Sequence, residues 1–134
     1  QARYGSAKSI IGISGVVNQE DMTRNKFSKN QLKELEKNGF FTLKDGAKKW
    51  KISGKYFYDR AWYGDIRQSI KSITCPVLAI HGTEDNDVPA ENSALMMGAL
   101  ENGRVVLVKG ANHSFSNPKH SKELIDAAVS WLAK

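Results

Sequence analysis

Two loop side chains are the candidates for chemistry, an acid and a histidine that each follow an apolar stretch. Asp85 follows the run Val77–Ile80, and His113 follows the β-branched run Arg104–Val108. A carboxylate can hold an imidazole in one tautomer and stabilise its charged form, and that imidazole can take a proton from a serine hydroxyl. An acid and a histidine of this kind can therefore serve nucleophilic catalysis if the fold brings Asp85 and His113 together.

The elements around this pair predict that its two loops lie together. A helix expected from Pro89 to Glu101 joins the two apolar runs, and a strand, a helix and a second strand form a βαβ unit. Such a connection makes the strands parallel and neighbouring. Both loops then leave the carboxyl ends of adjacent strands, where ligands bind in open α/β sheets. A last helix is expected from Pro118 to Ala133, with an inward apolar stripe of Leu124, Ile125, Ala128, Val129 and Leu132.

Other roles remain open for these side chains. Asp85 could instead be a turn carboxylate, and His113 could be a surface histidine. Asp87 is a rival acid, although it could also cap the helix that begins near Pro89. His81 lies at the end of a buried strand and is expected to be structural.

The segments HGTEDNDVP and GANHSF resemble the C-terminal part of the α/β-hydrolase family. In that family an acid lies in a HGxxDxxVP loop and a histidine in a GxxH loop, which Asp85 and His113 match. The resemblance implies an α/β fold, with parallel strands and flanking helices, and a Ser-His-Asp triad in the order serine, acid, histidine. Members of the family are longer than these 134 residues, and the chain opens on Gln1, so we expect a fragment.

The nucleophile is the missing part of this pattern. No G-x-S-x-G motif occurs, and Ser14 only partly imitates one, because Gly15 comes one position early and no helix signal follows. The strand expected over 9–17 would run through this serine instead. We therefore expect the attacking serine in an N-terminal portion of the same protein or in a second chain.

Residues 19–73 interrupt the alternation of strands and helices, and we predict that they form a cap or lid. The core would comprise 1–18 and 74–134. Ser28 and Gln31 have the spacing of a capping box, and Asp45-Gly46 indicates a hairpin turn. This cap loosely resembles the lid of cinnamoyl and feruloyl esterases. Its aromatic residues would line a substrate pocket or simply fill the small cap's own core, and the predicted substrate-binding residues are Trp50, Tyr58 and Trp62.

Composition limits the other classes of function. The formal net charge is +6, but the lysines are scattered and carry no nucleic-acid-binding signature, so no nucleic-acid partner is expected. No stretch is long and apolar enough to span a membrane, and the single Cys75 permits a reducing compartment, so we predict a cytoplasmic protein. No metal-ligand spacing or nucleotide motif is present, and no cofactor is predicted.

Together these observations predict an enzyme, a serine hydrolase that cleaves carboxylic esters of small molecules by acyl transfer. The same triad would serve a peptidase, a thioesterase or a lipase, because it does not choose the acyl group. A non-catalytic protein that binds a small molecule in the same pocket is the alternative of a different class.

Overall fold

The structure, a computed structural model, describes residues 7–17, 26–61 and 66–133. They divide into two compact units. Residues 7–17 and 66–133 form the first unit, and 26–61 form the second. The predicted core and cap were divided at 18/19 and 73/74, so the first unit gains the short helix α4 (Arg67–Lys71). That 19–73 acts as a lid stays a prediction.

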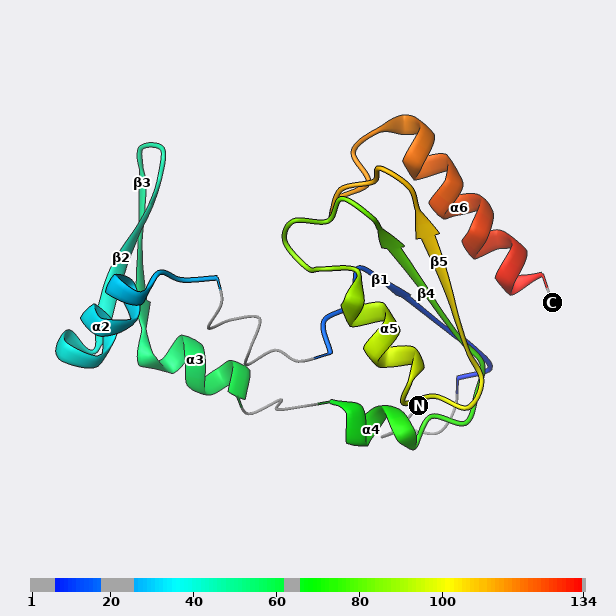
Figure 1. Ribbon diagram of the computed structural model, residues 1–134, viewed down its shortest axis with the longest axis horizontal. Helices are drawn as coiled ribbons and strands as arrows, with labels where there is room; N and C mark the ends of the chain where they lie inside the picture. The colour runs from blue at the N-terminus through cyan, green and yellow to red at the C-terminus, as the bar shows by residue number, and fades with distance from the viewer. Residues whose placement is uncertain (1–6, 18–25, 62–65, 134) are drawn as a thin grey trace. The chain divides into compact units, whose positions relative to one another are not determined.

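The first unit is built on a parallel sheet of three strands in the order β1-β4-β5 (Figure 1). The strands are β1 (Ile10–Ile13), β4 (Val77–Gly82) and β5 (Gly103–Val108). All six residues of β4 are buried, as an uninterrupted apolar run in the middle of a parallel sheet should be. The predicted α/β class and the parallel βαβ unit are confirmed.

Helices cover both faces of this sheet. Helix α5 (Glu91–Met97) connects β4 to β5, and α6 (Pro118–Leu132) follows β5 (Figure 1). Leu78 and Ile80 pack with α6 in the core cluster, whereas His81 contacts Ser93 of α5. Because side chains alternate along a strand, these contacts place the two helices on opposite faces.

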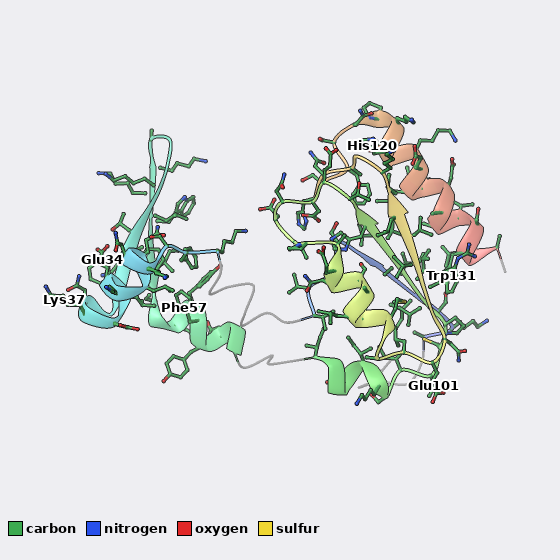
Figure 2. All side chains as sticks on the ribbon, viewed as in Figure 1. Glu34, Lys37, Phe57, Glu101, His120 and Trp131 are labelled. Carbon is green, nitrogen blue, oxygen red and sulfur yellow. The ribbon has the colours of Figure 1, made fainter. Side chains whose placement is uncertain are left out.

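The last helix begins where its capping residues predict. The Asn117 side chain accepts a hydrogen bond from the Lys119 amide at 2.9 Å, and Pro118 occupies the first turn. The predicted inward stripe is partly wrong, because Ile125, Val129 and Leu132 are exposed. The helix instead packs on the core through a neighbouring face, rotated from the predicted stripe by about one residue. This face is formed by Leu124, Ala127, Ala128 and Trp131. Figure 2 shows Trp131 on the side of α6 that faces the sheet.

Two predicted elements are shorter than expected. The strand expected over 9–17 ends at Ile13, because Ser14 has a left-handed backbone with φ of 47° that breaks the extended path. The helix expected from Pro89 to Glu101 extends only over Glu91–Met97.

The second unit consists of α2 (Lys29–Asn38), a hairpin of β2 (Phe40–Asp45) and β3 (Lys48–Ser53), and α3 (Gly54–Ala61). The predicted capping box is confirmed, since Ser28 and Gln31 bond each other's backbone amides at 3.3 and 2.8 Å. The core of this unit is aromatic: Phe41 is fully buried, and Phe27 makes edge contacts with Phe41, Tyr56 and Phe57. Among the described residues of the whole chain, no helix is long and apolar enough to cross a membrane.

Candidate active site

The acid is held by the backbone of its own loop. Asp85 follows β4, and its Oδ1 atom accepts hydrogen bonds from the amides of Asp87 at 3.0 Å and Val88 at 2.7 Å. This is the turn geometry that short acidic side chains form with amides two and three residues on. The turn leaves Oδ2 for other donors, so the turn and acid interpretations of Asp85 are compatible.

His113 supplies the first of those donors. Its Nδ1 atom lies 2.8 Å from Asp85 Oδ2. A carboxylate oxygen only accepts, so Nδ1 carries the proton of this bond. The Asp85 side chain is sealed from solvent, whereas the His113 side chain is 40% exposed. Within the described residues Nε2 of His113 has no hydrogen-bond partner, and this nitrogen is the one that can exchange a proton with a substrate or nucleophile.

The loop that carries His113 is anchored on both sides of the histidine. Ala111 and Phe115 are buried in the core cluster. The Ala111 carbonyl accepts from the amide of Glu84 in the acid loop at 3.0 Å. The Gly110 amide donates to Thr83 Oγ1 at 2.8 Å. These hydrogen bonds between the two loops fix the position of the histidine relative to the acid.

The hydrogen bonds to Asp85 outweigh its burial. Burial raises the pKa of this carboxyl, but the Val88 amide, the bond and charge of His113, and the Ser14 hydroxyl together lower it below the ordinary value of 3.8. Asp85 is therefore ionised at neutral pH and can orient the imidazole of His113 and balance its charge.

His81 touches the same carboxylate from the side of the sheet. Its Nε2 atom lies 3.2 Å from Asp85 Oδ2 and 2.9 Å from the Val88 carbonyl, and its Nδ1 atom lies 2.7 Å from Ser93 Oγ. The ring is fully buried, as expected from its place at a buried strand end. The sequence analysis missed its contact with the acid. Its spacing of four residues from Asp85 was the available signal.

Ser14 also lies at the site, where its hydroxyl acts on the His113 backbone and on the Asp85 carboxyl. It is buried at the end of β1, and its hydroxyl donates to the main-chain carbonyl of His113 at 3.4 Å. A left-handed φ would suit a nucleophile on a sharp turn, yet no helix follows within 15–17. Its hydroxyl bonds the His113 backbone and lowers the pKa of Asp85, which is a supporting position and not that of an attacking group.

The other predicted site residues lie elsewhere. Asp87, the rival acid, is exposed, and the structure brings Asp85 against His113 instead. Trp50 and Tyr58 belong to the second unit and are 52% and 80% exposed. Trp62 lies outside the described residues. A substrate-binding role for these three aromatic residues stays a prediction. Within the described part of the chain no three histidine, cysteine or acidic side chains are grouped to hold a metal ion.

Comparison with known proteins gives a family and a set of similar structures. The sequence profile of the prolyl oligopeptidase family matches residues 23–134. The structure resembles alpha/beta hydrolase domain-containing protein 10 from mouse, with 22% identity over 98% of this chain and a TM-score of 0.75. It also resembles Est1E from Butyrivibrio proteoclasticus, with 22% identity over 95% and a TM-score of 0.65. A monoacylglycerol lipase from Paleococcus ferrophilus shows 20% identity over 97% and a TM-score of 0.63.

This chain spans only part of each of those proteins. It covers 54% of the mouse protein, 52% of Est1E and 60% of the lipase. At these identities the likeness shows the fold, and it confirms the prediction that the chain forms a part of an α/β-hydrolase fold.

Proposed function

The chain belongs to the prolyl oligopeptidase family of α/β-hydrolases, and from this premise we propose that it supplies the acid and the general base of a serine hydrolase that cleaves carboxylic esters. One observation carries the proposal. His113 Nδ1 is bonded to the buried, ionised Asp85 at 2.8 Å, and its ring remains 40% exposed. An oriented imidazole with an accessible Nε2 is what a serine needs to lose its proton.

In the proposed reaction a serine attacks the ester carbonyl while His113 Nε2 takes the hydroxyl proton. Asp85 stabilises the imidazolium that forms. The alcohol leaves with the proton from Nε2, and an acyl-serine remains. Water then attacks the acyl group, with His113 again as the base, which releases the carboxylic acid and the free serine.

The serine would come from outside this chain segment. Ser14 bonds the main chain of His113, so its geometry does not favour it as the nucleophile. Ser14 also ties the His113 loop back to the end of β1, which pairs with β4 alone among the described strands. We propose that the serine-bearing portion, from the same protein or a second chain, approaches on the open side of β1.

Two features bear on the substrate. The cap resemblance noted in the sequence favours a small aromatic ester, and one of the similar structures is Est1E with ferulic acid bound. Trp50, Tyr58 and Trp62 would then contribute to the wall of the acyl pocket. The family description favours a second candidate, hydrolysis of peptide bonds, by the same triad.

The test uses the complete enzyme with three single substitutions. His113→Ala and Asp85→Asn should each lower kcat by about 10³-fold or more, since the members of a triad act as a unit. Asp87→Asn is the matched control and should retain activity, because Asp87 is exposed at the surface of the same loop. Wild-type turnover by His113→Ala would reject the catalytic assignment, whereas a complete wild-type protein that binds a small molecule without turnover would favour the non-catalytic alternative.

Substrate choice is tested separately. A complete enzyme that hydrolyses methyl ferulate and p-nitrophenyl acetate much faster than a proline-containing peptide anilide would support the ester proposal. The reverse order would replace it with the peptidase.

A further inference from the structure

We infer that His81 is a positioning residue: its Nε2–H holds the Val88 carbonyl of the acid loop, which keeps Asp85 in place toward His113, and the Ser93 hydroxyl holds the His81 ring. The inference deepens the proposed function, on which its catalytic consequence rests. The contacts that carry it belong to this chain alone and do not involve a nucleophile.

The direction of each hydrogen bond follows from the partners. Nε2 of His81 faces two oxygens, the Val88 carbonyl at 2.9 Å and Asp85 Oδ2 at 3.2 Å. Neither a carbonyl nor a carboxylate can donate, so Nε2 must carry a proton. Nδ1 lies 2.7 Å from Ser93 Oγ, which can donate to the lone pair of that nitrogen. The ring proton therefore goes to the Val88 carbonyl and the hydroxyl proton to Nδ1, while Asp85 Oδ2 lies beside the Nε2–H without being its hydrogen-bond partner.

The same ring joins three segments of the fold. His81 lies in β4, Asp85 and Val88 lie in the loop that follows, and Ser93 lies in α5. His81 and Ser93 are almost completely buried, at 0% and 1% exposure. Because a buried polar group without a partner is costly, this set of contacts favours a single arrangement of the loop.

The consequence is a carboxylate held from both ends. Oδ1 accepts two backbone amides, Oδ2 accepts His113 Nδ1, and His81 Nε2 lies 3.2 Å from Oδ2 on the other side. The Ser14 hydroxyl is the remaining group that acts on this carboxyl. Without His81 the Val88 carbonyl would lose its donor, and the Val88 amide that holds Oδ1 could shift and let the carboxylate turn. The angle of its bond to His113 would then be free to vary.

A pair of substitutions separates this role from simple filling of space. The side-chain amide of glutamine can place an N–H near the position of Nε2, whereas that of asparagine is too short to do so. His81→Gln should therefore keep the donor to the Val88 carbonyl, and His81→Asn should lose it. Ser93→Ala removes only the distal hydroxyl and should have the smaller effect.

The experiment is NMR of this 134-residue chain with ¹⁵N-labelled histidine at neutral pH. The wild-type chain should show His81 protonated at Nε2, and a protected Nδ1–H resonance for His113. That His113 resonance should persist in His81→Gln and be lost or broadened in His81→Asn, with circular dichroism confirming that the variants are folded. An Nδ1–H tautomer of His81 in the wild type, or an unchanged His113 resonance in folded His81→Asn, would overturn the inference.

The tautomer is read in the wild type, so the inference stays testable even if a variant fails to fold. In the complete enzyme His81→Asn should lower kcat on the order of 10- to 100-fold with KM little changed, and His81→Gln should recover much of it. A failure of the proposed function would be seen in a different measurement. Unchanged activity of His113→Ala in the complete enzyme would reject the proposed function, whatever the NMR of His81 shows.

Discussion

The backbone of the histidine loop passes close to Gly82 at the end of the acid strand, so replacing this glycine tests how the site is assembled. A Cβ atom at Gly82 would overlap the Ala111 carbonyl oxygen and lie 2.7 Å from the carbonyl carbon. These are backbone atoms, and Ala111 is fully buried and bonded to the Glu84 amide. The loop cannot yield by turning a side chain, so Gly82→Ala must displace the backbone that carries His113.

The expected cost follows from the size of this overlap. Forcing one methyl group into a packed site typically costs about 1 to 3 kcal/mol, and sometimes more. For a chain of this size that corresponds to a fall in Tm of roughly 4 °C per kcal/mol. The same displacement should broaden or shift the His113 Nδ1–H resonance, because Ala111 is two residues from the histidine.

Gly12→Ala is the matched control in the same sheet. Its added Cβ would meet only Met96 Cε, at 3.6 Å, which is an ordinary contact. The stability should change little, or rise by about 0.4 to 1 kcal/mol because the unfolded chain loses freedom. Urea unfolding would be followed by Trp131 fluorescence in a background with Trp50→Phe and Trp62→Phe, since Trp131 packs on the core of the first unit. Equal stability of the two variants would refute the close-approach argument.

Three further predictions concern the acid, the missing nucleophile and the second unit. The folded pKa of Asp85 lies below its ordinary value of 3.8, so its stabilising effect should be complete above that pH and lost as the pH falls through the folded value. The stability advantage of the wild type over Asp85→Asn should therefore shrink in acid, and a constant difference in urea titrations would contradict this. Intact mass after treatment with a fluorophosphonate should show no adduct on this chain, and an adduct would make Ser14 the attacking residue. Ser28→Ala should destabilise the second unit by about 1 kcal/mol, while Asn30→Ala on the exposed face of α2 should be nearly neutral in thermal unfolding.

Much of the architecture was predictable because it depends on neighbours in the sequence. The apolar run before Asp85 and the β-branched run before His113 indicate two strands, and the connecting helix makes them parallel. Local rules also predicted the capping box at Ser28 and the turn at Asp45-Gly46. The same topology places the acid and the histidine at one sheet edge, and the structure brings their side chains to 2.8 Å.

Other features depended on contacts that no local pattern contains. The periodicity of α6 allows a broad apolar stripe, and only packing selects the face of Leu124 and Trp131 over that of Ile125 and Val129. Ser14 has a left-handed backbone, and its hydroxyl bonds the backbone of His113, a residue far along the chain.

The sequence by itself determined which residue types meet at the sheet edge, because strand order and loop position follow from the alternation of strand and helix. Only the tertiary structure decided how Asp85 is held. Its carboxylate accepts hydrogen bonds from two amides of its own loop and from His113 in the loop after β5, and His81 of β4 lies 3.2 Å from it. The physical reason is that a hydrogen bond requires distance and direction to a few tenths of an ångström, which only the packed chain can supply.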